Sequence, residues 1–187
     1  MNPHILSLLK KLEQQKQSSD IGLWNVSWEV GKFLHQLVFM YKPKTILEIG
    51  TSNGFSALWM ASAASVYGGE VYTIESSPKR IPLAKEHFKL SGLDNIFLFE
   101  GHAPEIFPVF GNKKFEMIFI DATKKQYFDF FHALQPYFAD KVLLLADNIL
   151  SHPEPVQEYL DTVRNNSEAI SVCLPFGAGI EMTLFQK

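Results

Sequence analysis

The segment "TILEIGTSNGFSALWMA", residues 45–61, decides the fold of this chain. Its first five residues, Thr45–Ile49, are mostly apolar and form a run short enough for a buried strand. Gly50 and Gly54 then allow the backbone to turn tightly, and Phe55–Ser65 has the pattern of a helix. A strand that passes through glycines into a helix is typical of the βαβ units of a parallel sheet.

The same alternation continues along the rest of the chain. Further strands are predicted at Glu70–Ile74, Ile96–Phe99, Phe115–Ile120 and Val142–Ala146, and further helices at Pro78–Leu90, Pro104–Phe110 and Lys124–Tyr137. Near the C-terminus, residues 169–176 and 180–187 are β-rich runs around the glycine-rich turn 177–179, which predicts a hairpin with one antiparallel strand. We therefore expect an α/β fold with a mostly parallel sheet.

The composition is ordinary for a soluble globular protein, with 47% hydrophobic and 20% charged residues. The length of 187 residues predicts one domain, 1–187, with N-terminal helices in 1–43 and the core in 44–187. The net charge of −3 and the lack of a basic patch argue against broad nucleic-acid binding. The single cysteine, Cys173, cannot form an internal disulfide, which is typical of a reducing compartment.

The N-terminal segment has the pattern of an amphipathic helix. Ile5, Leu8, Leu9 and Leu12 recur at helical spacing. The segment does not show the basic start followed by a long apolar stretch that is typical of a signal peptide. No apolar run approaches the roughly 20 residues that cross a bilayer. We expect a cytoplasmic protein without a membrane partner.

The ends of the predicted strands indicate a ligand, because open α/β sheets bind ligands beyond the carboxyl ends of their strands. The first strand ends in the Gly50–Gly54 turn, and the second ends in Glu75. An acidic side chain at that place can accept hydrogen bonds from both hydroxyls of a ribose. Alone, the glycines could serve only a tight turn and Glu75 could serve only as a cap of the next helix. Together, they favour a nucleoside ligand.

Two later strand ends carry oxygen ligands. Asp121 follows one apolar strand, and Asp147 and Asn148 follow the next. Three hard oxygen donors suit Mg²⁺, Mn²⁺ or Ca²⁺ rather than zinc. Lys124 stands at the start of a predicted helix, where the macrodipole disfavours a cation and a functional reason is therefore expected.

These segments resemble a known family. "LEIGTSNGFSALWMA", "VYTIESSP", "FIDATKKQY" and "LLADNIL" are similar to the signature segments of the metal-dependent O-methyltransferases that use S-adenosylmethionine, the catechol and caffeoyl-coenzyme A enzymes and their bacterial relatives. The resemblance runs from about Asn25 to the C-terminus. It implies a Rossmann-like class I methyltransferase fold with seven strands, a C-terminal antiparallel strand and helices on both faces.

The resemblance also implies roles for individual residues. The cofactor-binding residues that it implies are Val26, Glu48, Gly50, Ser52, Gly54, Ser56, Glu75, Ser76, His102, Ala103 and Asp121. Asp121, Asp147 and Asn148 match the metal ligands, and Lys124 matches the catalytic lysine that takes the proton. Its neighbour Lys125 is expected to point away and to lack this role.

The substrate side departs from the family pattern. Trp24, Lys124 and Glu181 are the expected substrate contacts, with Glu181 in "GAGIE" matching an acid of the catechol enzymes. The Trp and Pro side chains that enclose a catechol ring in those enzymes are matched here by Gly22, Thr123 and His152. Ala178 replaces an expected Asp, and the segment after Asn148 is shorter than the usual lid loop.

The expected reaction is transfer of a methyl group to a hydroxyl of a small phenolic or vicinal-diol acceptor, and a homodimer is compatible with the resemblance. A tRNA hydroxyuridine O-methyltransferase is the main alternative, less favoured because of the negative net charge. A nicotinamide-dependent oxidoreductase is disfavoured by the glycine spacing and the oxygen donors. A non-catalytic nucleoside-binding module is disfavoured by Lys124 and the intact metal triad.

Overall fold

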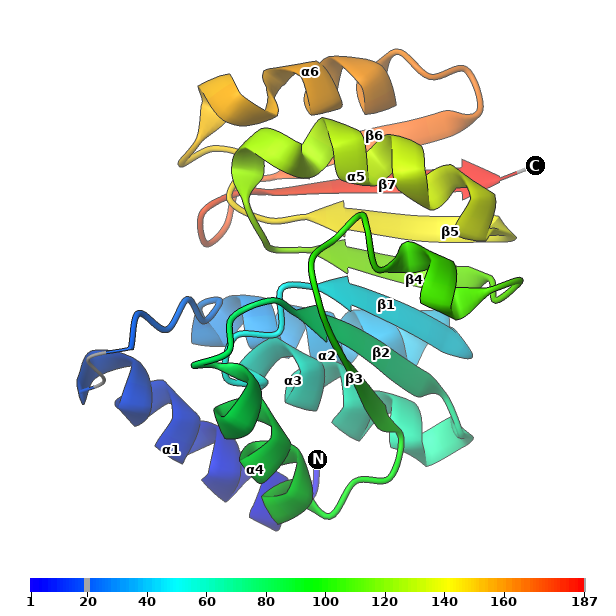
Figure 1. Ribbon diagram of the computed structural model, residues 1–187. Helices are drawn as coiled ribbons and strands as arrows, with labels where there is room; N and C mark the ends of the chain where they lie inside the picture. The colour runs from blue at the N-terminus through cyan, green and yellow to red at the C-terminus, as the bar shows by residue number, and fades with distance from the viewer. Residues whose placement is uncertain (19–20, 187) are drawn as a thin grey trace.

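The computed structural model of this protein describes residues 1–18 and 21–186, and one seven-stranded sheet forms its centre (Figure 1). The strand order is β3-β2-β1-β4-β5-β7-β6. The strands are β1 (Thr45–Ile49), β2 (Glu70–Glu75), β3 (Ile96–Glu100), β4 (Phe115–Ile120), β5 (Phe138–Ala146), β6 (Ala169–Leu174) and β7 (Ile180–Gln186).

The sheet is mostly parallel, as the sequence predicts. Strands β1 to β5 pair in parallel, whereas β7 pairs antiparallel with both β5 and β6. This confirms the C-terminal hairpin and the α/β fold. The last residue of the predicted second run, Lys187, lies outside the described residues.

The α-helices cover both faces of the sheet, as expected (Figure 1). They are α1 (Pro3–Ser18), α2 (Trp28–Tyr41), α3 (Phe55–Ala64), α4 (Ile81–Ser91), α5 (Tyr127–Leu134) and α6 (Pro153–Arg164). Helices α1 to α4 pack with Ile46, Val71 and Phe119 on one face. Helices α5 and α6 pack with Leu47, Ile118 and Leu144 on the other, so alternate residues of each strand point to opposite layers.

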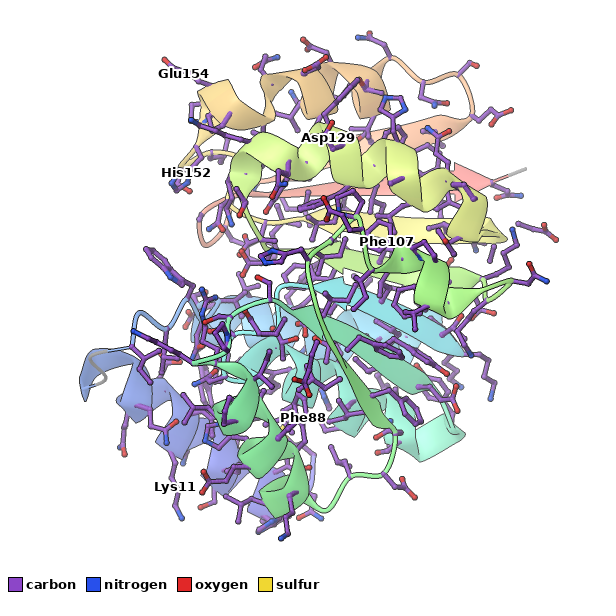
Figure 2. All side chains as sticks on the ribbon, viewed as in Figure 1. Lys11, Phe88, Phe107, Asp129, His152 and Glu154 are labelled. Carbon is purple, nitrogen blue, oxygen red and sulfur yellow. The ribbon has the colours of Figure 1, made fainter. Side chains whose placement is uncertain are left out.

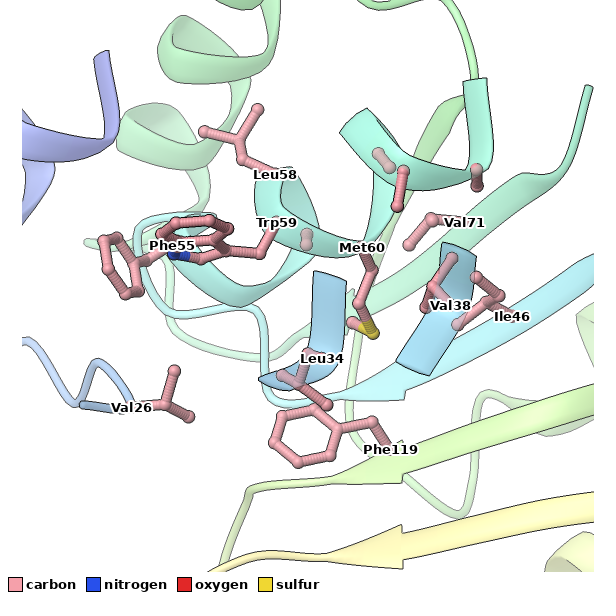
Figure 3. Packing of buried hydrophobic residues seen from close by; sticks show 14 of the residues in the cluster. Val26, Leu34, Val38, Ile46, Phe55, Leu58, Trp59, Met60, Val71 and Phe119 are labelled. Carbon is pink, nitrogen blue, oxygen red and sulfur yellow. The ribbon is translucent and has the colours of Figure 1, made fainter. Parts of the chain in front are cut away.

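Helix α3 is enclosed on all sides. All ten of its residues are buried, because α2 packs beside it on the same face of the sheet and α1 also packs against it; Figure 3 shows Leu34 and Val38 of α2 near the strand residues Phe119 and Ile46. The close approach depends on Gly31, where an added Cβ would lie 2.3 Å from the indole nitrogen of Trp59. This packing fixes the start of α2 and the segment before it relative to the glycine turn.

Three predicted helices are wrong in detail. At Pro104–Phe110 the chain forms turns and a short 3₁₀ helix, Phe107–Phe110, because Pro108 has no N–H to donate to the carbonyl of Pro104. Phe107 donates to that carbonyl instead, at 3.0 Å. The helix expected from Pro78 begins only at Ile81, after a turn in which the N–H groups of Arg80 and Ile81 both donate to the Ser77 carbonyl.

The third predicted helix, Lys124–Tyr137, is shorter at both ends than the sequence predicts. Between Lys124 and Tyr137 only α5 is α-helical, and it lies between the 3₁₀ turns Lys124–Gln126 and Gln135–Tyr137. Helix α6 was absent from the predicted elements. None of the helices in the described residues is both long and apolar enough to cross a membrane.

The loops that follow the parallel strands gather at one edge of the sheet, at the left of Figure 1. The hairpin turn between β6 and β7 joins them there. Backbone N–H groups of Ile149, Leu150 and Ser151 donate to the carbonyls of Gly179 and Ala178 at 3.0–3.2 Å. These bonds hold the segment after Asn148 against the hairpin.

Candidate active site

A cavity of about 860 Å³ opens at the carboxyl ends of the strands. This volume is within the range of small-molecule sites. Its lining comes from the segment before α2, the ends of β1, β2, β4 and β5, the start of α6 and the hairpin turn. The cavity is lined by most of the residues that are predicted to bind the cofactor, the metal or the substrate: Trp24, Val26, Gly50, Ser52, Glu75, Ser76, His102, Ala103, Asp121, Lys124, Asp147 and Asn148.

The glycine turn after β1 has the backbone form that the sequence indicates. Gly50 has φ of 108°, and a Cβ there would lie 2.1 Å from the carbonyl oxygen of Asp121. Gly54 has φ of 91° and begins α3, and Ser52 between them has φ of 52°. Only a glycine at position 50 allows β1 and β4 to end this close together.

Glu75 is buried and firmly oriented at the end of β2. Its Oε2 accepts a hydrogen bond from the Ser52 N–H at 2.7 Å, and its Oε1 accepts from the N–H groups of Ser76 and Ser77 at 3.1 and 2.8 Å. Arg80 lies 3.7 Å from Oε1. Because a carboxylate has about four acceptor positions, these donors orient the side chain and leave capacity for a ligand hydroxyl.

Lys124 and Asp121 form an ion pair inside the cavity. The Lys124 Nζ lies 2.8 Å from the Asp121 Oδ1, and both side chains are largely buried, with exposed fractions of 16% and 10%. Lys124 is in the short 3₁₀ turn before α5, so it does not oppose the dipole of a long helix. Its ammonium also lies 5.6 Å from the ring centroid of Tyr127.

Tyr127 joins the two strand ends that carry the acidic residues. Its buried hydroxyl lies 3.2 Å from the Ile120 carbonyl and 3.1 Å from the Asp147 carbonyl, and its single proton is shared between these two acceptors. Burial raises the pKa of this phenol well above its usual value, and the charges of Asp121 and Asp147 add to the shift. The hydroxyl therefore stays protonated and keeps β4 and β5 in place at the site.

Asp147 and Asn148 line the cavity next to Asp121, because β4 and β5 are neighbouring strands. Burial, and then the charge of Asp121, raise the pKa of Asp147 to about 7. The Asp147 Oδ1 accepts from the N–H of Asn148 at 2.8 Å, and Asn148 has φ of 65°, in the left-handed region. A non-glycine residue in this conformation is uncommon and often marks a functional position.

The three oxygen-bearing side chains fit a divalent cation by their chemistry. A buried carboxyl group such as that of Asp147, whose pKa is raised by burial and by a neighbouring carboxylate, is stabilised in its charged form by a nearby positive charge. Across residues 1–18 and 21–186, no three His, Cys, Asp or Glu side chains come together as a metal site. The set Asp121, Asp147 and Asn148 has only two carboxylates and a carboxamide, so its role in metal binding stays a prediction.

Three of the expected cofactor residues do not line the cavity. Glu48 is completely buried beneath the turn and is hydrogen-bonded to the hydroxyl of Thr73, which lies 2.5 Å from the Thr51 hydroxyl. Gly54 and Ser56 form the start of α3 behind the turn. These residues support the turn from inside the protein, and a direct ligand contact from Glu48 is excluded by its burial.

The expectation for Glu181 is wrong. Its side chain is fully buried under α6, where Arg164 donates to both carboxylate oxygens at 2.8 and 2.7 Å and the Ser171 hydroxyl donates at 2.7 Å. This arrangement raises the pKa of Arg164, chiefly through its hydrogen bonds to Glu181. Glu181 therefore fixes α6 to β6 and β7 and does not face the cavity.

The segment before α2 covers one side of the cavity. The N–H of Trp24 donates to the Ser52 hydroxyl at 3.2 Å, and the side chain of Asn25 donates to the Leu12 carbonyl at 3.4 Å. Val26 is buried, whereas Trp24 is 73% exposed although it lines the cavity. Gly22, one of the positions that match the catechol enclosure, is not part of the lining.

The sequence does not predict several of the lining residues. Arg80, Gln126 and Pro155 belong to the wall but carry no motif. Lys125 also lines the cavity, contrary to the expectation that it points away, because a 3₁₀ turn rather than an α-helix carries both lysines past the rim. His152 directly precedes α6 and is labelled in Figure 2. It belongs to the segment after Asn148 that the sequence predicts to be a shortened lid loop.

The sequence and the fold both have known relatives. Residues 2–173 match the O-methyltransferase family. A catechol O-methyltransferase from Niastella koreensis is 34% identical over 138 residues, which cover 72% of this chain and 62% of the relative. A catechol O-methyltransferase from Mycobacterium tuberculosis is 36% identical over 101 residues, 54% of this chain and 46% of the relative. This chain thus matches about half to three fifths of the length of these relatives.

Solved structures agree on the fold. The O-methyltransferase from Bacillus cereus, determined in complex with SAH, has a TM-score of 0.88 at 24% identity, over 96% of this chain and 91% of that one. TomG from Streptomyces achromogenes, an O-methyltransferase of tomaymycin synthesis determined in complex with SAM, has a TM-score of 0.85 at 24% identity, over 96% and 90%. With the match over residues 2–173, the chain belongs to the O-methyltransferase family.

Proposed function

We propose that this protein is an S-adenosylmethionine-dependent O-methyltransferase that methylates a hydroxyl of a small phenolic or vicinal-diol acceptor with the help of a divalent cation. One observation carries the proposal. A single cavity joins Glu75, which is oriented by backbone N–H groups at 2.7–3.1 Å, to the Lys124–Asp121 ion pair and the buried Asp147. Family membership and the names of the relatives support it.

The nucleoside end of the cavity fits the cofactor. Glu75 would accept hydrogen bonds from the ribose hydroxyls, and the Gly50 turn, which also lines the cavity, would border the methionine part. Gly101, His102 and Ala103 line the wall next to Glu75 and would border the adenine. These residues position the methyl donor, and alignment of oxygen, carbon and sulfur supplies a large share of the catalytic effect.

At the other end, Lys124 would act as the general base in its neutral form. The ammonium of the Lys124–Asp121 pair would first release a proton to solvent, and the neutral amine would then accept the proton of the acceptor hydroxyl. The oxygen forms a bond to the methyl carbon as the carbon–sulfur bond breaks, and the sulfonium becomes a neutral thioether. The positive charge is thus transferred to Lys124, which lies 2.8 Å from the carboxylate of Asp121. This ion pair keeps the ammonium in place after the transfer.

Asp121, Asp147 and Asn148 would hold the cation. A bound Mg²⁺ or Mn²⁺ would lower the pKa of an acceptor hydroxyl and orient two adjacent hydroxyls. The buried carboxyl group of Asp147, whose pKa is raised to about 7, favours the presence of such a charge. The three side chains also line the cavity together with Lys124.

A methyl-transfer screen with labelled S-adenosylmethionine tests the proposal. The acceptors are a vicinal diphenol, the same phenol with one hydroxyl removed, and tRNA with and without hydroxylated uridine. We expect label in the diphenol product only, and only when Mg²⁺ or Mn²⁺ is present. Label in tRNA alone would assign the site to the tRNA alternative, and cofactor binding without any transfer would support the non-catalytic one.

A further inference from the structure

The far end of the cavity, beyond the Lys124–Asp121 pair, carries a cation that no acid balances. This part of the lining comes from the turn that carries Lys124 and from the start of α6, which pack against each other, and it consists of Thr123, Lys125, Gln126, His152 and Pro155. The acids of the lining lie elsewhere: Glu75 is at the nucleoside end, and Asp121 and Asp147 are beside Lys124. The end therefore has no carboxylate of its own.

Lys125 is the cation in question. Lys125 takes part in none of the ion pairs found among residues 1–18 and 21–186. Asp129 follows four residues later, which is the usual spacing for an ion pair on a helix. The two do not pair, because the chain around Lys125 is a 3₁₀ turn and Asp129 belongs to the α-helix that follows. The ammonium of Lys125 is thus free for a ligand.

Two further side chains of this end, Thr123 and His152, are polar. They stand at positions that match the Trp and Pro side chains of the catechol enzymes in the sequence resemblance. His152 is hydrogen-bonded through its Nδ1 to the Ser151 hydroxyl at 2.9 Å, and this hydroxyl donates to the Asn148 carbonyl at 3.2 Å. Helix α6, which His152 directly precedes, packs against the 3₁₀ turn that carries Lys125. The two polar side chains thus come from neighbouring elements.

We propose that the acceptor is a vicinal diphenol with an anionic substituent, a carboxylate, and that Lys125 binds this substituent. The inference rests on the proposed function. Lys124, Asp147 and Lys125 line the same cavity, so an acceptor whose hydroxyl groups lie at Lys124 and Asp147 can present a charged substituent of its ring to Lys125. Lys125 then selects the acceptor, whereas Lys124 takes part in the reaction.

The test compares three acceptors with the holoenzyme: catechol, protocatechuate, which carries a carboxylate, and dopamine, which carries an ammonium. The measured quantity is the ratio of kcat/KM for protocatechuate to kcat/KM for catechol. We expect a ratio above one for the unmodified protein. Lys125→Gln should lower the ratio by about fivefold, the effect of a partly exposed ion pair. Lys125→Glu should make dopamine a better acceptor than protocatechuate.

Lys89→Gln is the matched control. Lys89 is exposed in the last turn of α4, at the end of the helix away from Arg80 and the cavity, so this variant removes the same charge without touching the lining. The ratio should stay as in the unmodified protein. High salt should also reduce the preference for protocatechuate, because screening weakens an exposed pair.

Two results would overturn the inference alone. One is methylation of catechol at least as efficient as that of protocatechuate in the unmodified protein. The other is an equal ratio for the Lys125→Gln and Lys89→Gln variants. In both cases the proposed function remains, because catechol is methylated. Absence of transfer to all three acceptors would overturn the proposed function and the inference together.

Discussion

The buried carboxyl group of Glu48 should make the stability of the fold depend on pH. Glu48 lies at the end of β1 with no exposed surface, directly before the glycine turn. Burial raises its pKa from 4.5 to about 7, and the charges of Asp121 and Glu75 add to the shift, while the hydroxyls of Ser56 and Thr73 oppose it. The perturbation is Glu48→Gln, which keeps the shape and removes the titration.

The sign follows from the direction of the shift. In the unfolded chain the carboxyl group loses its proton near pH 4.5, whereas in the folded protein it retains the proton until about pH 7. The folded state binds more protons in this window, so the contribution of Glu48 to the free energy of unfolding falls as the pH rises from 4.5 to 7. Between pH 5 and pH 8 this loss is about 2–3 kcal/mol, and it is absent from the Gln variant.

The assay is urea unfolding of both proteins across this pH range, in the presence of a chelator. The free energy of unfolding of Glu48→Gln, relative to the unmodified protein, should increase by about 2–3 kcal/mol from pH 5 to pH 8. Any constant cost of the amide cancels in this comparison. The exposed Glu158→Gln is the control for the loss of one charge. A difference that does not change with pH would refute the reasoning and mean that the folded protein stabilises the Glu48 carboxylate.

Three other predictions concern the site itself. Glu75→Ala should weaken binding of S-adenosylmethionine by about 1–3 kcal/mol in calorimetry, since charge-assisted hydrogen bonds are lost; unchanged affinity would remove Glu75 from the cofactor site. Lys124→Met should lower kcat by roughly 10²–10⁴-fold with cofactor affinity retained, whereas a parallel loss of cofactor binding would indicate a structural lysine. Treatment with EDTA should abolish turnover and Mg²⁺ or Mn²⁺ should restore it, and full activity after thorough chelation would contradict the role of Asp121, Asp147 and Asn148.

Much of the fold could be predicted because its signals are local. β1 and β4 begin and end where the apolar runs do, and the hairpin is marked by glycines whose φ values of 63° and 86° other residues rarely adopt. The helices were less accurate, since Pro108 and Pro136 interrupt the hydrogen-bond ladder at positions where apolar periodicity continues. Helix α6 was overlooked because its start follows directly on the expected lid segment.

By itself, the sequence determined which chemical groups stand at the ends of the strands. A parallel sheet brings the carboxyl ends of its strands to one edge, so the order of Glu75, Asp121 and Asp147 along the chain was sufficient to place them around one cavity. Only the tertiary structure decided which side chains face that cavity. Glu181 is at the same edge but its carboxylate turns under α6 to Arg164, and Lys125 reaches the cavity that it was expected to avoid. The direction of a side chain depends on packing between elements far apart in the chain, which no local pattern specifies.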